Sequence, residues 1–551
     1  MSTSITEKRE ERSGSVIPSH LAATADVTRT EAPVTIKAYL MCAFASFGGI
    51  FFGYDNGYIG NVFSMPAFIH QFTKLPYPPA TPLADFVISS RDQSLITSIL
   101  SAGTFFGAVI AGDCADFFGR SYTIIAGCMI FMVGVAIQMS SSTIAVLAAG
   151  RVIAGLGVGF ESAIVILYMS EIAPKKVRGA LVSGYQFAIT LGLLLASVVG
   201  YSTKDRLDSG AYRIPIGIQF AWALILATGI ACLPESPRYY VKRGKIEKAI
   251  KALSSLRGQS PDSEYIQSEL SEIIANHEYE MRVIPQGSYF SSWANCFKGS
   301  LWHQGSNIRR TILGTSLQMM QQWTGVNFIF YFGTVFFTQL GSISNPFLIS
   351  IITTLVNVCS TPISFWLIER FGRRPMLIYG GLGMLSCQFI TAIIGTAVGT
   401  DNKAATSTMI AFICMAISFF AATWGPVAWV VIGETFPLQI RSRGVGLSTA
   451  SNWMWNCILA VISPYFVGEK YGNLGAKVFF IWGGLCTCAT VYAYFLVPET
   501  KGLTLEQVDQ MMEETTPRTS AGWKPTKTFA SQMGIVDGDL KMGEERIEHK
   551  V

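Results

Sequence analysis

Two charged residues lie inside stretches of sequence that are otherwise apolar. Asp55 interrupts the run FFGYDNG, and Arg151 begins the run RVIAGLG. An unpaired charge at the centre of a bilayer costs about 3 kcal/mol or more, so each residue is the best candidate partner for the other. An aspartate beside a guanidinium stays ionised, whereas one left alone in an apolar cavity takes up a proton. A movement that separates the two residues could therefore load and release a proton, although a permanent structural ion pair is the alternative.

Side-chain amides form a second group that could do chemistry, because amides both donate and accept hydrogen bonds and so match sugar hydroxyls. Seven of the amides in apolar stretches are the candidates, namely Gln186, Gln321, Gln322, Asn327, Asn357, Asn452 and Asn456. A charged substrate would require buried Arg or Lys residues, and Arg151 is the one deep candidate. The pattern favours a neutral polyol or sugar, although any single amide could instead form a hydrogen bond between helices.

The elements that must position these residues are membrane-spanning helices. The chain has 551 residues, of which 50% are hydrophobic and 14% are charged, whereas soluble domains average about 25% charged residues. A bilayer needs about 20 apolar residues per helix. Twelve candidate spans lie near 37–62, 93–115, 121–141, 144–170, 180–200, 216–234, 311–340, 346–368, 376–398, 408–434, 444–467 and 475–497.

The positions of these spans predict the domain organisation. We expect a disordered N-terminal tail, a six-helix bundle, a linker with short surface helices, a second six-helix bundle and a C-terminal tail, over residues 1–36, 37–234, 235–310, 311–497 and 498–551. Basic residues gather in the short loops after the second, fourth, eighth and tenth spans. Such loops stay in the cytoplasm, so both tails and the linker are expected to be cytoplasmic.

Three motifs of the first half recur in the second. GDCADFFGRS (112–121) corresponds to LIERFGRRP (367–375), SEIAPKKVRG (170–179) to GETFPLQIRSRG (433–444), and LPESPRYY (233–240) to VPETKGLT (497–504). Two parallel six-helix halves around a central cavity are typical of rocking transporters. Charges in these motifs could form a cytoplasmic latch that biases the outward-facing state, or could only set topology. The predicted latch residues are Asp116, Arg120, Glu171, Arg178, Glu235, Glu369, Arg373, Glu434 and Arg441.

Two spans contain weak points that predict moving gates. Gly425 and Pro426 interrupt the tenth span just before Trp429, because proline lacks an N–H and clashes with the preceding turn. The seventh span has a similar interruption around Thr324, and Tyr331 beyond it is the predicted outer lid.

The motifs together resemble the sugar porter family of the major facilitator superfamily. The resemblance covers about residues 37–505, and its specific motifs are GGIFFGYDNGYIG, GRVIAGLGVG, PESPRY, QQWTGVNFIFY, ERFGRRP, WGPVAWVVIGETFP and PETKG. It implies an all-α membrane protein with twelve helices in two pseudo-symmetric six-helix bundles and a helical segment between them. It also implies the Asp55–Arg151 pair and a set of sugar contacts at Phe52, Gln186, Gln321, Gln322, Asn327, Asn357, Trp429 and Asn452.

The function expected from these observations is secondary active transport. We expect a monosaccharide:proton symporter for a hexose or a pentose, with glucose first, that works as a monomer in the plasma membrane. A facilitative uniporter, a carrier of another neutral polyol or disaccharide, and a transporter-like nutrient sensor are the alternatives. The sequence has no phosphate-binding glycine loop, metal-ligand spacing, serine elbow or basic stripe, so we expect no enzyme activity, cofactor, metal or nucleic-acid partner.

Overall fold

The computed structural model describes most of the chain, and every regular element in the described part is a helix. The described residues are 36–74, 88–174, 177–283, 293–303, 305–339, 345–399, 402–437, 439–467, 472 and 474–524. The predicted tails therefore fall outside the described residues, except at residue 36 and over 498–524.

The N-terminal half contains the first six spans. A short helix, α3 (Pro66–Thr73), follows the first of them. The spans are α1 (Ile36–Ala45) with α2 (Gly48–Val62), α4 (Ser90–Phe118), α5 (Arg120–Ser140), α6 (Ile144–Ile172), α7 (Arg178–Thr203), and α8 (Gly210–Gly217) with α9 (Gln219–Cys232).

The C-terminal half contains the other six, so the twelve predicted spans are confirmed. They are α14 (Asn307–Trp323) with α15 (Val326–Gln339), α16 (Pro346–Ser360) with α17 (Ile363–Arg370), α18 (Arg373–Ala397), α19 (Lys403–Ala422) with α20 (Trp424–Thr435), α21 (Arg441–Val467) and α22 (Val478–Leu496). Between the halves lie α10 (Pro237–Lys242), α11 (Ile246–Arg257) and α12 (Glu264–Val283), and α23 (Leu505–Glu514) follows the last span.

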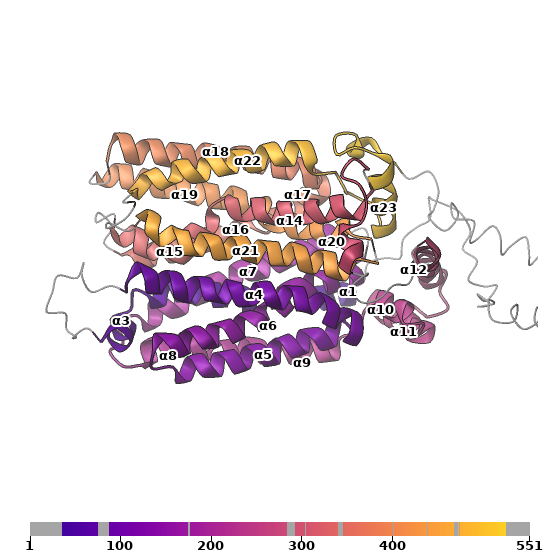
Figure 1. Cartoon of the computed structure of the whole chain (residues 1–551), viewed down its shortest axis with the longest axis horizontal. Helices are drawn as coiled ribbons and strands as arrows, with labels where there is room; N and C mark the ends of the chain where they lie inside the picture. The colour runs from indigo at the N-terminus through magenta and orange to yellow at the C-terminus, as the bar shows by residue number, and fades with distance from the viewer. Residues whose placement is uncertain are drawn as a thin grey trace, which may run out of the picture.

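The two halves lie side by side with their spans running in the same general direction (Figure 1). Helices α10, α11, α12 and α23 gather at one end of the bundle, called here the linker end, and α3 lies at the opposite end, called the α3 end. Helices α10 to α12 share a small apolar core of their own, built on Val241, Leu253, Ile266 and Leu270.

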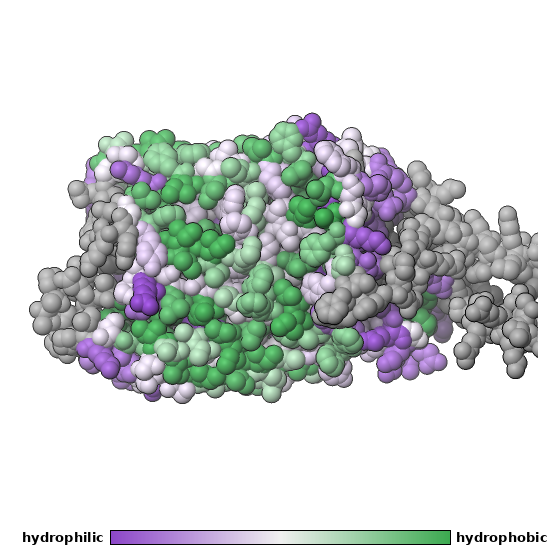
Figure 2. Space-filling view, viewed as in Figure 1, coloured by the Kyte–Doolittle hydropathy of each residue, from purple (hydrophilic) through white to green (hydrophobic). Residues whose placement is uncertain are grey.

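The outer surface of the bundle fits a membrane. Figure 2 shows apolar side chains around its middle and hydrophilic ones toward both ends. Within the described residues, ten helical spans are long and apolar enough to cross a bilayer. Two spans remain. A break divides α14 from α15, and α21 contains side-chain amides. Both line the central cavity described below, which explains why they are less apolar.

The break in the tenth span lies at Thr423, two residues before the predicted Gly425–Pro426 interruption. Thr423 leaves the helical conformation, with φ −134° and ψ −85°, and α20 begins at Trp424. Pro426 therefore falls in the first turn of a new helix, where a missing N–H removes no intrahelical hydrogen bond. The seventh span does break where expected, at Gly325, whose φ of +78° suits glycine.

Glycines allow α4 and α6 to pack with their backbones in close contact. A Cβ added at Gly107 would lie 2.3 Å from the carbonyl oxygen of Leu156, and one at Gly155 would lie 2.3 Å from that of Leu100. Gly103 and Gly159 extend the same arrangement one turn further in each helix. Small residues four apart are a recurrent way to pack membrane helices, because the apolar solvent gives helices little other reason to associate.

We expect Gly107→Ala to destabilise the folded protein by about 1–3 kcal/mol, because the new methyl group would overlap a backbone oxygen that cannot move alone. Thermal unfolding of the detergent-purified protein would measure the effect. Gly484→Ala is the matched control, since that glycine also lies in a membrane helix and nothing is within 4 Å of its added Cβ. Equal melting temperatures for the two variants would contradict the prediction.

Candidate functional site

A cavity at the centre of the bundle lies between the two halves. Its empty volume is about 540 Å³, and it is lined by α2, α7, α14, α15, α19, α20 and α21. Seven of the eight predicted sugar contacts line it, namely Phe52, Gln186, Gln321, Gln322, Asn327, Trp429 and Asn452, together with the predicted lid Tyr331. Asn357 does not, because it is buried within α16 and neither of its amide atoms has a hydrogen-bond partner in the described part of the chain.

The amides of the C-terminal half form one connected hydrogen-bond network. Gln322 donates to Asn452 Oδ1 at 3.0 Å and accepts from Asn456 Nδ2 at 3.1 Å. Asn452 donates in turn to Gln318 and Gln321, at 2.7 and 2.8 Å. The network therefore fixes the amide orientations before any ligand enters, as a preorganised polar site requires.

Three polar members of the site were missed or set aside in the sequence analysis. Gln318 precedes Gln321 by three residues, so helical spacing could have placed the two on one face of α14. Asn456 follows Asn452 by four residues in the same way, and it lines the cavity. Asn56 lines the cavity as the neighbour of Asp55, and no signal in its local sequence distinguished it.

Aromatic side chains from both halves cover the cavity. Phe52 meets Trp453 edge to face with ring centroids 4.9 Å apart, and Tyr185 meets Trp429 in the same way at 5.7 Å. Toward the α3 end, the Tyr331 hydroxyl donates to Asn56 Oδ1 at 3.2 Å, so a hydrogen bond between α15 and α2 closes this side. A cavity with amide and aromatic walls suits a ligand that has both hydroxyls and apolar C–H faces.

The direct ion pair expected between Asp55 and Arg151 is absent from this arrangement. Both side chains are buried, and in the described part of the chain neither oxygen of Asp55 accepts a hydrogen bond. Arg151 instead donates to the Ile96 carbonyl oxygen and to the Tyr58 hydroxyl, both at 2.7 Å. The sequence could not show that a backbone carbonyl and a phenol would satisfy the guanidinium, although Tyr58 lies one turn from Asp55 on α2.

At the linker end, most of the predicted latch residues bind within their own half. Arg120 pairs with Glu171 at 2.9 Å, and Arg373 pairs with Glu434 at 2.8 Å. Each arginine also lies within 4.0 Å of the acid four residues before it, Asp116 or Glu369. The repeated motifs therefore build the same helix-to-helix tie twice.

Two acids in the repeated PES and PET motifs cap helix N-termini. Glu235 binds the starts of α5 and α10, and Glu499 binds the start of α18. Glu235 accepts hydrogen bonds from the backbone N–H groups of Ser121 and Ser236, at 3.0 and 2.8 Å. Glu499 accepts equivalent bonds from Arg373 and Arg374, at 2.9 and 3.1 Å. Burial raises the pKa of Glu235, and these hydrogen bonds and the charge of Arg120 offset only part of that effect.

The contacts that cross between the halves involve two predicted latch residues, Asp116 and Glu369, and also residues outside that set. Arg443 pairs with Asp113 at 2.9 Å and lies 3.7 Å from Asp116, which also accepts a hydrogen bond from Ser442 at 2.8 Å. A second crossing contact runs from the backbone N–H of Ala180 to Glu369 at 3.0 Å. Asp113 and Arg443 belong to the recurring motifs, but the sequence does not show which residues of one half face which residues of the other.

The remaining predicted latch residues, Arg178 and Arg441, are buried at the first turns of α7 and α21. Arg441 donates to the Phe436 carbonyl oxygen at 2.9 Å. Glu434, by contrast, binds Arg373 and also accepts a hydrogen bond from Thr500 at 2.7 Å.

Comparisons with known proteins agree with this geometry. The family model described as "Sugar (and other) transporter" matches residues 41–512. The major facilitator-type transporter ecdD of Aspergillus rugulosus is 45% identical over 500 residues, which cover 89% of this chain and 90% of that protein. The "Probable glucose transporter rco-3" of Neurospora crassa is 40% identical, over 91% of this chain and 84% of the relative.

A sensor and a solved structure are also similar. The high glucose sensor RGT2 of Saccharomyces cerevisiae is 41% identical over 87% of this chain, which spans only 61% of that protein. The proton:xylose symporter XylE of E. coli, solved with 6-bromo-6-deoxy-D-glucose, is 24% identical with a TM-score of 0.72, over 86% of this chain and 99% of XylE. At this identity the likeness shows the fold alone.

We expect Arg443→Ala to loosen the linker end, because it removes the ion pair that crosses between the halves. Loss of a hydrogen bond to a charged group costs about 1.5–3 kcal/mol, so local opening should become about tenfold more frequent. Hydrogen–deuterium exchange of peptides containing residues 113–118 and 441–446 would measure it. Arg206→Ala is the control, since it removes an exposed ion pair with Asp208 elsewhere. Exchange that stays at the wild-type rate would show that Arg443 does not hold the halves together.

Proposed function

Because the chain belongs to the sugar porter family of the major facilitator superfamily, we propose that this sugar transporter imports a monosaccharide together with a proton across the plasma membrane. Glucose is the first candidate substrate, and a pentose is the second. The observation that carries the proposal is a central cavity whose lining is uncharged and rich in amides, with an unbonded buried acid, Asp55, next in sequence to the lining residue Asn56.

The cavity lining supports a neutral, hydroxyl-rich substrate. Every residue that lines it is uncharged, and the amides come from both halves, with Asn56 and Gln186 on one side and the α14–α21 network on the other. A buried amide that loses its partner is costly, so sugar hydroxyls must replace the amide–amide hydrogen bonds as they enter. A substrate that binds both halves can bring them together, which is the step that alternating access requires.

The position of Asp55 supports proton coupling. An ionised carboxylate that is buried without a hydrogen bond or an ion pair costs several kcal/mol. That cost disappears if Asp55 binds a proton or if Arg151 approaches it. A movement of α2 against α6 can therefore switch Asp55 between a protonated state and an ionised state paired with Arg151. The neighbouring residue, Asn56, lines the sugar cavity and binds Tyr331, so closure over the sugar acts directly on the helix turn that carries Asp55.

The membrane potential makes this exchange useful. One proton that moves down 100 mV releases about 2.3 kcal/mol, which supports about 50-fold accumulation of sugar at one proton per sugar. A facilitative carrier with the same cavity would not accumulate sugar. Glucose sensing is the second candidate function, because a relative named as a sensor shares 41% identity with this chain. A sensor would bind sugar in the same cavity without net uptake.

We expect Gln322→Ala to weaken the apparent affinity for glucose at least about tenfold, because it leaves several amide partners unsatisfied and removes one sugar contact. The measurement is the concentration dependence of labelled glucose uptake by cells that lack their own hexose carriers. Asn357→Ala is the matched control, since that buried amide lies outside the cavity and its loss should change the affinity less than about twofold. Equal effects of the two substitutions would show that the amide network is not part of the sugar-binding site.

We expect Asp55→Asn to abolish accumulation of sugar against a gradient while it leaves exchange of labelled for unlabelled sugar, because an amide cannot carry the transported proton. Uptake with and without a protonophore, at two external pH values, measures this. Glu161→Gln is the control, since Glu161 is also fully buried but lies against Cys128 on α5, away from Arg151. If the Asp55→Asn variant still concentrates sugar, the transporter does not couple protons at this residue.

A further inference from the structure

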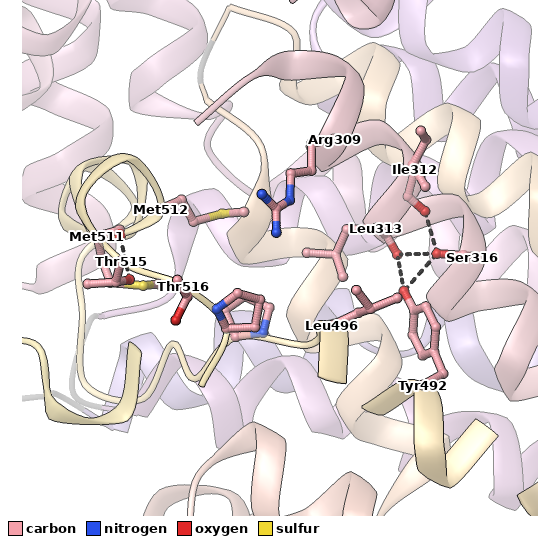
Figure 3. A pocket seen from close by; sticks show the side chains of 12 residues that line it. Arg309, Ile312, Leu313, Ser316, Tyr492, Leu496, Met511, Met512, Thr515 and Thr516 are labelled. Atoms are coloured by element: carbon pink, nitrogen blue, oxygen red, sulfur yellow. Dashed lines mark hydrogen bonds between the residues drawn. The ribbon is translucent and has the colours of Figure 1, made fainter. Parts of the chain in front are cut away.

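A second pocket lies at the linker end of the C-terminal half, away from the central cavity. It encloses about 510 Å³ between the start of α14, the end of α22, and α23 with the segment after it (Figure 3). It shares no lining residue with the central cavity and contains none of the ion-paired residues described above. The transport cycle proposed above therefore does not use it.

The walls of this pocket are mostly apolar and adaptable. Ile312, Leu313 and Leu496 form one side, and Met511 and Met512 form another. Methionine side chains are flexible and polarisable, so they fit ligands of irregular shape. The hydroxyl groups of Ser316 and Tyr492, which also line the pocket, are bonded to each other at 2.7 Å and so offer little to a polar ligand. These walls suit an apolar chain.

One positive charge faces this apolar space. The guanidinium of Arg309 extends toward the pocket in Figure 3. In the described part of the chain it makes no hydrogen bond or ion pair, whereas the next residue, Arg310, is buried and paired with Asp509. A guanidinium binds a phosphate or a carboxylate with two parallel hydrogen bonds. The pocket therefore matches an amphiphile that has an anionic head.

The level of the pocket along the membrane normal indicates where such an amphiphile would come from. Helix α14 begins at Asn307 and α22 ends at Leu496, so Arg309 lies near the linker end of the bundle, and Figure 2 shows hydrophilic side chains toward that end. Ile312 and Leu496 are 47% and 48% exposed, and they connect the pocket wall to the outer apolar surface of the bundle. A lipid in the adjacent leaflet could place a chain in the pocket while its headgroup stays at the level of Arg309.

We propose that this pocket binds an anionic phospholipid from the membrane, with the phosphate on Arg309 and an acyl chain against Leu313, Leu496 and Met512. The lipid would contact α14 and α22 on one side and the C-terminal segment on the other. It would therefore hold α23 against the bundle in addition to the Arg310–Asp509 ion pair. The proposal is independent of which sugar is carried and of whether a proton accompanies it.

The test is a titration of the full-length, detergent-purified protein with phosphatidylserine, followed by its thermal unfolding. Phosphatidylcholine with the same acyl chains and free oleate are the comparison ligands. We expect phosphatidylserine to raise the melting temperature at lower concentration than either. Arg309→Gln should weaken this effect about tenfold, the cost of losing charge-assisted hydrogen bonds. Arg370→Gln, which changes an exposed arginine at the same end outside the pocket, should leave it unchanged.

A photoactivatable phosphatidylserine with the reactive group in its acyl chain gives a readout that does not depend on a variant. We expect labelled peptides to include residues 309–316 or 511–517. Three results would overturn the proposal: equal stabilisation by phosphatidylcholine, equal stabilisation by oleate, or an Arg309→Gln variant that responds as the wild type does. Labelling confined to other surfaces of the bundle would also overturn it.

Discussion

A polar group inside a membrane has no water to bind, so it must find its partner within the protein. This constraint explains most of the interior of the transporter. The amides of α14 and α21 bind one another, Arg151 binds a backbone carbonyl oxygen and a phenol, and the arginines of the repeated motifs each bind a glutamate. Some buried polar groups lack such a partner in the described structure, and Asp55 is an acid among them, with neither oxygen hydrogen-bonded. Because a buried carboxylate without a partner is costly, the proposed proton coupling is assigned to this residue.

The repeated motifs and the contacts between halves have different roles. Arg120 with Glu171 and Arg373 with Glu434 tie helices within each half, and the backbone N–H bonds to Glu235 and Glu499 reinforce those ties. Each half can therefore move as a unit, which a rocking mechanism needs. The contacts that must break and form again include those of Arg443 and Glu369 near the linker end and those of Tyr331 and Ser94 near the α3 end.

The sequence predicted the spans, the two-half architecture and most of the cavity lining, because each depends on local patterns. Apolar length defines a span, and amides within apolar runs must meet in the interior. What it could not predict depends on how helices cross. Asn357 and Asn456 are equivalent in sequence terms, yet α16 turns one away from the cavity and α21 turns the other into it. In the same way, only the register between halves shows that Arg443 meets Asp113, and only the path of α6 brings Arg151 to Tyr58.

The two closures of the central cavity differ in strength, and this difference gives the resting transporter a direction. Toward the α3 end, neutral hydrogen bonds join the halves, from Tyr331 to Asn56 and from the Ser94 hydroxyl to the Val461 carbonyl oxygen, and each such bond contributes about 0.5–1.5 kcal/mol. Toward the linker end, Arg443 binds Asp113 and lies near Asp116, and a single charge-assisted bond contributes about 1.5–3 kcal/mol. Opening at the α3 end therefore costs less, so the empty cavity opens there first. If the linker end faces the cytoplasm, as the basic loops indicate, the end that opens at the lower cost is the one that faces outside.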